Sequence, residues 1–280
     1  MSLISGFETS RLIALKSREV DASAPRPWPF FSWLRAGQFA LAAVILLLVQ
    51  YAVDSGAVKQ IYLASPTQIV AAFPRLVGQS NLLYHLYITL SEALLGFALA
   101  LILGVATGIA MGLFSRVNTF FSPFLVAMMA IPKVTIIPLL TLYLGIGFSH
   151  KVFIVFLFGY FIFVFNTIAG IRQVDEKHLK VASAFGASRL QIITKIILPS
   201  AVPSIMAAVR LEAAMCLVAA LFAEIVASKA GLGNMLNRAV GVYDTASVFA
   251  LVVTITAIAL ITVSFINFLE KRVFLRWKFV

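Results

Sequence analysis

The residues from Lys180 to Pro199 read Lys-Val-Ala-Ser-Ala-Phe-Gly-Ala-Ser-Arg-Leu-Gln-Ile-Ile-Thr-Lys-Ile-Ile-Leu-Pro. They form the middle of a polar, basic segment, Gln173 to Pro203, which separates two very apolar stretches of the chain. A membrane protein with one large loop of soluble character usually makes its contact with a cytoplasmic partner there. This segment is therefore the first candidate for a functional surface.

Within the loop, the residues from Glu176 to Leu190 have the composition and spacing of a short helix. Gly186 permits a tight turn or the close approach of another backbone. A second basic amphipathic run follows over Ser188–Leu198, and Pro199 is expected to stop or redirect it. Two short helices joined at a glycine would make a projecting knob. An amphipathic hairpin on the membrane surface fits these residues equally well.

Composition places the whole chain in a membrane. Hydrophobic residues make up 61% of its 280 residues and charged residues 12%, against about 45–50% apolar in soluble domains. The apolar residues lie in blocks long enough to cross a bilayer, and only helices can do so singly. We predict an all-α membrane protein with about six transmembrane helices, at Trp33–Val53, Leu86–Phe114, Phe120–Ile146, Val152–Ile171, Ile205–Ala227 and Ala246–Phe268.

The placement of Lys and Arg predicts the orientation. With the N-terminus inside, fifteen of the 22 cations lie on the cytoplasmic side and five outside, Lys151 among the five. Both termini and the loop are then cytoplasmic, and residues 54–85 are periplasmic. Segment 1–32, whose start has the pattern of a surface helix but is also compatible with disorder, and the basic tail 269–280 flank the membrane. Attraction of Lys and Arg to anionic lipid explains the net charge of +11. The sequence contains no nucleic-acid-binding motif, so the charge does not indicate a nucleic-acid partner.

Small residues recur at every fourth position in the second span, which indicates a helix that packs closely. The third span is irregular: its prolines predict a kink, and a kinked helix often lines a pathway. A static kink is equally compatible. A charge within a span is costly and should pair or face water. The stripe is Gly96, Ala100, Gly104, Gly108 and Gly112, and the pathway candidates are Lys133, Pro138 and Glu224. Snorkelling to a membrane end is the alternative for Lys133, and an interfacial or a buried, hydrogen-bonded carboxylate is the alternative for Glu224.

Motifs for chemistry are missing from the sequence. It has no phosphate-binding loop, no His/Cys cluster with metal spacing and no G-x-S-x-G motif. The single cysteine, Cys216, rules out an intrachain disulfide. We interpret the chain as a conduit and not an enzyme, with its energy source on another polypeptide.

Several motifs resemble one family of transporters. The loop, with Ala182, Gly186 and then Ile196-x-Leu198-Pro199, resembles the loop by which permeases of bacterial ABC importers contact their ATPase. From about Ser65 onward the chain is similar to the nitrate, sulfonate, taurine and bicarbonate branch of type I importers. The supporting stretches are Ser65-Pro66-Thr67, Leu90–Phe97, Ile131–Leu139, Leu144–Gly147, Asn166–Gly170 and Gly231–Gly233.

This resemblance implies a complex in the bacterial inner membrane. Two permeases, copies or paralogues, would dock their loops onto two ATPase subunits, which bind the ATP and Mg²⁺; this chain would bind no cofactor or metal. A periplasmic or lipid-anchored binding protein would deliver the solute. The coupling residues would be Lys180, Val181, Ala182, Ser183, Phe185, Gly186, Ala187 and Arg189, with Ile196, Leu198 and Pro199 shaping the loop.

Two residues depart from the family pattern. Lys180 stands where the family usually has an acidic residue at the start of the loop motif, and Lys133 stands where an apolar residue or proline is commoner. If Lys133 faces the pathway, it favours an anionic solute. The rival interpretations are a secondary transporter or channel that works without ATP, and a membrane scaffold. Co-purification of an ATPase separates them from the importer.

Overall fold

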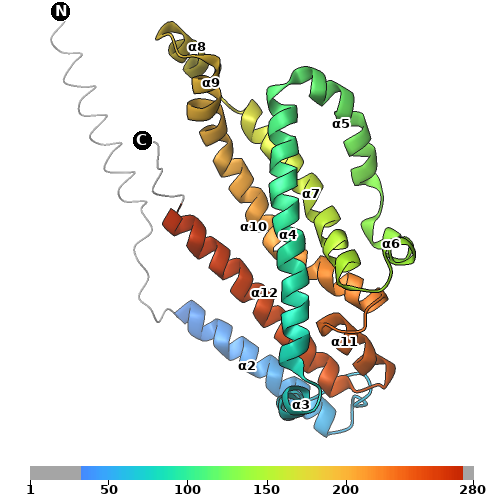
Figure 1. Ribbon diagram of the computed structural model, residues 1–280. Helices are drawn as coiled ribbons and strands as arrows, with labels where there is room; N and C mark the ends of the chain where they lie inside the picture. The colour runs from blue at the N-terminus through green and yellow to red at the C-terminus, as the bar shows by residue number, and fades with distance from the viewer. Residues whose placement is uncertain (1–32, 274–280) are drawn as a thin grey trace, which may run out of the picture. The chain divides into compact units, whose positions relative to one another are not determined.

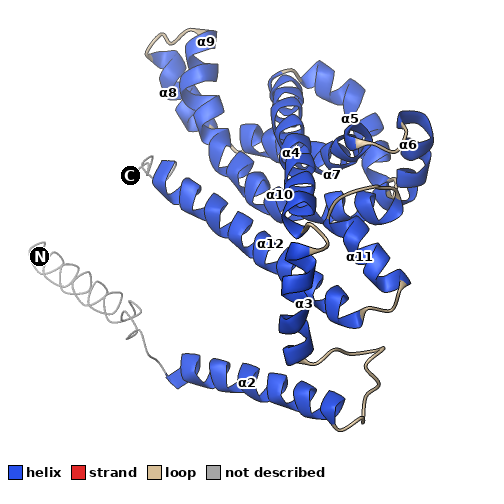
Figure 2. Cartoon of the chain, turned by 60° about the horizontal axis from the view of Figure 1, so that its bottom comes forward, coloured by secondary structure: helices blue, strands red, loops and turns tan. Residues whose placement is uncertain are grey.

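The computed structural model describes residues 33–273, and every regular element in this range is a helix (Figures 1 and 2). The chain divides into two units, Met1–Ala57 with helix α2 and Val58–Val280 with the others. The predicted surface helix near the N-terminus and the last seven residues of the basic tail lie outside the described residues. The long helices are α2 (Trp33–Asp54), α4 (Leu82–Leu113), α7 (Phe148–Arg172), α10 (Leu198–Val226) and α12 (Thr245–Val273). The shorter helices are α3 (Pro66–Gly78), α5 (Ser115–Ala130), α6 (Ile137–Leu144), α8 (Glu176–Ala184), α9 (Arg189–Ile192) and α11 (Leu232–Gly241).

Five of the described helices are long and apolar enough to cross a membrane. A sixth span results if α5 and the segment Lys133–Leu144 are counted together, although they meet at a bend of 81°. The prediction of an all-α protein with about six spans is confirmed.

Helices α4 and α7 form the most closely packed pair of the second unit, because α4 presents its small residues to α7. A Cβ atom added at Gly96 would lie 2.5 Å from Val155 Cβ, and one at Gly108 would lie 2.5 Å from Thr167 Cβ. Gly104 and Gly112 face Phe163 and Ile171 in the same way. In a bilayer such close approach replaces the hydrophobic drive as the source of helix association. Helix α10 adds its alanines to this core, among them Ala208, Ala219 and Ala220.

The predicted third span, Phe120–Ile146, is wrong as a single helix. The helix begins earlier, at Ser115, and ends at Ala130; Ile131 is extended, with φ −67° and ψ 127°. A residue before proline disfavours the helical conformation, so Pro132 explains the break. Pro123 lies inside α5, whereas Pro138 lies in the first turn of α6, where no amide hydrogen is needed. The 81° bend therefore lies at the break that precedes and includes Pro132.

The predicted stop at Pro199 is also wrong. A continuous helical run extends from Arg189 to Val226, 38 residues. A wider π turn over Ile193–Ile197 precedes the proline, and the Leu198 amide donates to the carbonyl of Ile193, five residues back. This turn accommodates a proline, which lacks an amide hydrogen and clashes with the carbonyl four residues earlier. The second helix of the loop and the fifth span are one rod, and Figure 1 shows α9 leading directly into α10.

The short helices α3 and α11 lie at the opposite end of the second unit from α8 and α9 (Figure 1). Helix α3 begins with a capping box, in which the Ser65 hydroxyl accepts from the Gln68 amide and the Gln68 side chain accepts from the Ser65 amide. Its buried Ala72 and Leu76 join Leu232, Met235 and Leu251 in one apolar cluster. This cluster holds α3 and α11 against α12.

Candidate functional site

The loop between α7 and α10 forms a compact projection, which we call the knob (residues 173–198). Helix α8 is capped at its start by Asp175, whose carboxylate accepts from the Lys177 amide at 2.8 Å. Gly186, two residues beyond its end, has a left-handed φ of +75°. The amides of Gly186 and Ala187 donate to the carbonyls of Ser183 and Ala182, each at 3.0 Å. This paired arrangement is a helix stop that favours glycine at its left-handed position.

The second helix of the knob starts immediately after this stop. The Ser188 hydroxyl accepts from the Gln191 amide, and the Gln191 side chain accepts from the Ser188 amide. Ser-x-x-Gln before an apolar run is a known signal for a helix start, and we did not use it in the sequence analysis. The two caps make the turn between α8 and α9 a defined structure.

The knob exposes apolar side chains at its tip. Val181 is 55% exposed, Leu190 71% and Phe185 87%. Lys180 forms an ion pair with Glu176 at 3.5 Å, but both side chains are largely exposed, so the pair contributes little stability. The predicted coupling residues all lie on the knob: Lys180, Val181, Ser183, Phe185, Gly186 and Arg189 are exposed, and Ala182 and Ala187 are half-buried. Ile196, Leu198 and Pro199 are half-buried on the rod that leads into α10.

A second group of polar residues surrounds the break between α5 and α6. Lys133, half-buried, donates to the Phe158 carbonyl at 3.3 Å, and its ammonium lies 5.4 Å from the ring centres of Phe158 and Phe161. These contacts stabilise a cation that is partly removed from water. The adjacent Gly159 faces Glu212 of α10, where an added Cβ would lie 2.9 Å from the carboxylate. Pro138 is exposed on the first turn of α6.

Glu212 is a functional candidate that the sequence analysis missed. Its carboxylate is fully buried and has no hydrogen-bond partner among the described residues. It interacts electrostatically with Lys133. The sequence does contain a signal for Glu212, because an acidic residue within an apolar span usually marks a functional site or an ion pair in the membrane.

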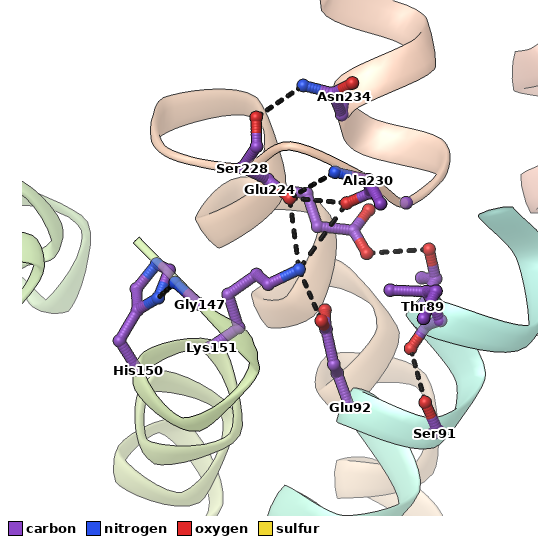
Figure 3. A network of polar contacts seen from close by, with 12 residues as sticks. Thr89, Ser91, Glu92, Gly147, His150, Lys151, Glu224, Ser228, Ala230 and Asn234 are labelled. Atoms are coloured by element: carbon purple, nitrogen blue, oxygen red, sulfur yellow. Dashed lines mark hydrogen bonds and ion pairs between the residues drawn. The ribbon is translucent and has the colours of Figure 1, made fainter. Parts of the chain in front are cut away.

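The third group lies at the end of the bundle opposite the knob and includes Glu224 (Figure 3). Glu224 is 1% exposed, and its carboxylate accepts from the Thr89 hydroxyl and from the Gly233 amide, both at 2.7 Å. The Leu232 amide donates to Thr89 Oγ1 at 2.8 Å. The Gly231 amide donates to His85 Nδ1 at 2.8 Å. Helix α11 thus has its first amides satisfied by side chains of α4 and α10.

This arrangement assigns Glu224 a structural contact. A carboxylate at a helix N-terminus is stabilised by the unpaired amides and by the helix dipole. Gly231 has φ +115°, and a Cβ there would collide with Glu224, so the Gly231-Leu232-Gly233 motif serves this close approach. Glu224 is thus buried among α4, α10 and α11.

Lys151, which we counted among the external cations, is instead buried in α7. Its ammonium forms an ion pair with Glu92 of α4 and donates to Ser228 Oγ at 3.0 Å (Figure 3). The side chains of Lys151 and Glu92 are 5% and 0% exposed. The sequence analysis placed Lys151 just before a span, whereas α7 begins three residues earlier at Phe148. Removing either partner of such a buried pair leaves an uncompensated charge.

Comparisons with known proteins agree with these features. Residues 96–275 match the family described as binding-protein-dependent transport system inner membrane component. A putative aliphatic sulfonates transport permease from Bacillus subtilis is 32% identical over 248 residues, 89% of each chain. A riboflavin transport system permease from Chloroflexus aurantiacus is 30% identical, covering 89% of this chain and 92% of the relative. The membrane chain of a solved amino acid ABC transporter shares the fold, with a TM-score of 0.59 at 16% identity, over 75% of this chain and 99% of that one.

The sulfonate relative lies in the branch that the sequence motifs indicated. The chain belongs to the family of binding-protein-dependent transport system inner membrane components: it is a multi-pass permease subunit of an ABC importer.

Proposed function

We propose that this permease pairs with a second permease, a copy or a paralogue, to form an alternating-access pathway for a small anionic solute. A periplasmic or lipid-anchored binding protein delivers the solute, and two separate ATPase subunits bind ATP and Mg²⁺ and drive the cycle. The N-terminus and the knob lie in the cytoplasm of a bacterium, and the protein spans its inner membrane. The observation that carries the proposal is the capped knob with its exposed apolar tip.

The tip has the character of a protein contact. An aromatic and aliphatic surface flanked by charged residues is typical of the centre of an interface, where a few large side chains supply most of the affinity. Phe185 projects from the helix stop itself, and its backbone is held by two hydrogen bonds around Gly186. The partner surface that covers Phe185 is the cleft of the ATPase. Lys180, in place of the usual acid, implies an acidic or neutral residue opposite it.

The long helix links the knob to the far end of the bundle. Arg189–Val226 spans 38 residues, which is roughly 57 Å of helix at 1.5 Å per residue. Its far end carries Glu224 and the contacts to α11. A displacement of the knob by the ATPases therefore acts along one rod on both ends of the pathway, as expected for a two-state transporter.

Lys133 supports an anionic solute. It lies where a span is broken by 81°, and transporters place solute sites at discontinuous helices. Lys133 is only half-buried, which supports a role in contact with a passing solute. The relatives differ in solute, from aliphatic sulfonates to riboflavin, so the anion class rests on Lys133 and not on the family.

The test compares two single substitutions of exposed aromatic residues. Phe185→Ala removes the tip of the knob, whereas Tyr62→Ala removes a side chain 75% exposed at the other end of the bundle. We expect Phe185→Ala to weaken ATPase association at least about tenfold and to abolish stimulation by the binding protein. Tyr62→Ala should leave ATPase association unchanged. Gly186→Arg, which strains the left-handed turn, should behave like Phe185→Ala.

If no ATPase co-purifies with the wild-type permease and transport persists without ATP, the importer mechanism is wrong and a secondary transporter replaces it. If an ATPase co-purifies and both Phe185→Ala and Gly186→Arg retain full stimulation, the knob is not the coupling element.

A further inference from the structure

The ion pair of Lys151 and Glu92 lines a cavity at the end of the bundle opposite the knob. The cavity has a volume of about 170 Å³. Ile88, Ile146 and Phe148 supply its apolar wall, and Gly147 and Ser228–Ala230 complete it with the two charged residues. A space this large and partly polar holds several waters or a small organic molecule.

The charges on the wall favour an anion. Lys151 and Lys229 are cations and Glu92 is an anion, so the lining carries one net positive charge. Glu224, the next carboxylate, is outside the lining, and its charge is directed to the amides at the start of α11. Lys229 is exposed at the rim, whereas the ammonium of Lys151 is held at the base by Glu92, Ser228 and the Ala230 carbonyl.

Glu92 fixes the position of the lysine on this wall. One of its oxygens pairs with Lys151, and its carboxylate also interacts with the neighbouring carboxylate of Glu224. Both oxygens of Glu92 are buried. The pair therefore holds Lys151 at the base of the cavity, and recognition of an anion rests on the two lysines.

We propose that this cavity is an entry site for the transported solute, with an anionic group toward Lys229 and Lys151 and a short apolar body against Ile88, Ile146 and Phe148. This inference rests on the proposed import function and extends it to a solute class and a location. The site needs only weak affinity for the solute, because a docked binding protein releases its solute there at a high local concentration. It is separate from Lys133, which lies at the break between α5 and α6.

Thiol labelling of the full permease–ATPase complex in lipid nanodiscs tests the charge of the cavity. Ile146→Cys, in a Cys216→Ala background, places a single thiol on the exposed wall; Val242→Cys, 74% exposed at the same end, is the matched reference. The two probes are sulfonatoethyl methanethiosulfonate, an anion, and its trimethylammonioethyl analogue, a cation. The ratio of anion to cation labelling rates should be roughly threefold to tenfold higher at position 146 than at position 242. Lys229→Glu should reverse this preference at position 146 and change position 242 little.

Protection tests binding itself. Ethanesulfonate at millimolar concentration should slow labelling of Ile146→Cys by either probe, and dimethyl sulfone, which is neutral, should not. Equal rate ratios at the two positions, or no protection by ethanesulfonate, would overturn the entry site and leave Lys151–Glu92 a structural pair. ATPase stimulation by the binding protein, measured on the same nanodiscs, separates that outcome from failure of the import function.

Discussion

Substitution of Gly108 by alanine should destabilise the protein, although alanine is the better helix former. A Cβ atom at this position in α4 would lie 2.5 Å from Thr167 Cβ and 2.9 Å from the Val164 carbonyl oxygen of α7. Neither atom can rotate away, because the Val164 oxygen belongs to the backbone and Thr167 Cβ is bonded directly to its own Cα. The two helices must separate, which weakens van der Waals contacts along their whole interface.

The expected magnitude follows from two opposing terms. Overpacking costs about 1–3 kcal/mol, and the clash at Gly108 belongs at the upper end. Replacing glycine by alanine within a helix returns about 1 kcal/mol. The net loss is therefore about 2 kcal/mol, which corresponds to a decrease in Tm of about 4–8 °C for a chain of this size.

Two further glycines calibrate the prediction. At Gly78, the last residue of α3, an added Cβ has no atom within 4 Å, so Gly78→Ala should leave Tm unchanged or raise it. At Gly112 the closest atom, at 2.6 Å, is Ile171 Cδ1, the flexible end of a side chain, so Gly112→Ala should be intermediate. The same chemical change should thus give three different results according to the neighbour.

The protein carries its own reporter for the assay. Cys216 is the only cysteine, and it is buried with Ala93, Val155 and Leu217, residues of α4, α7 and α10. Its reaction with a fluorogenic maleimide during a temperature ramp reports the opening of this three-helix core. If Gly108→Ala leaves the temperature of Cys216 exposure unchanged or raises it, as Gly78→Ala should, the close packing of α4 on α7 is wrong.

Two other predictions concern the end of the bundle opposite the knob. Gly231→Ala, which strains a left-handed residue and drives a Cβ into Glu224, should lower Tm by several degrees, whereas Gly241→Ala, with open space around it, should not; equal effects would contradict the close approach at the start of α11. Burial alone would raise the pKa of Asp244, but hydrogen bonds from Ser247 and the Arg75 guanidinium at 2.9 Å outweigh it and hold the pKa below its usual value. This carboxylate therefore stabilises the protein above about pH 4, and the contribution is lost as the pH falls through its lowered pKa. Asp244→Asn should remove that part of the dependence of Tm on pH, and an unchanged profile would contradict it.

Much of the fold follows from local sequence. Apolar blocks longer than about 20 residues predict spans, because the bilayer requires helices of that length. The knob was recognisable because its polar composition, its helical spacing and Gly186 are local features of the sequence. The glycine stripe of α4 likewise follows from the period of one helix.

Other features depended on contacts between distant segments. Local sequence gave the three prolines of the third span equal weight, yet only Pro132 lies at a break between helices; Pro123 lies inside α5, and Pro138 lies in the first turn of α6. Pro199 was predicted to end a helix, but a π turn carries the rod through it. The sequence does not reveal such a turn, since it is a property of backbone hydrogen bonds.

The charged residues show most clearly which features follow from local sequence and which depend on tertiary contacts. The sequence by itself determined that this is a helical membrane protein with a polar knob, because hydropathy and helical period are properties of neighbouring residues; its motifs resembled those of importer permeases. Only the tertiary structure decided that Lys151 is buried against Glu92, that Glu224 holds the start of α11, and that Glu212 lies near Lys133. The physical reason is that the cost of a charge in a membrane depends on which partners three separate helices bring to it.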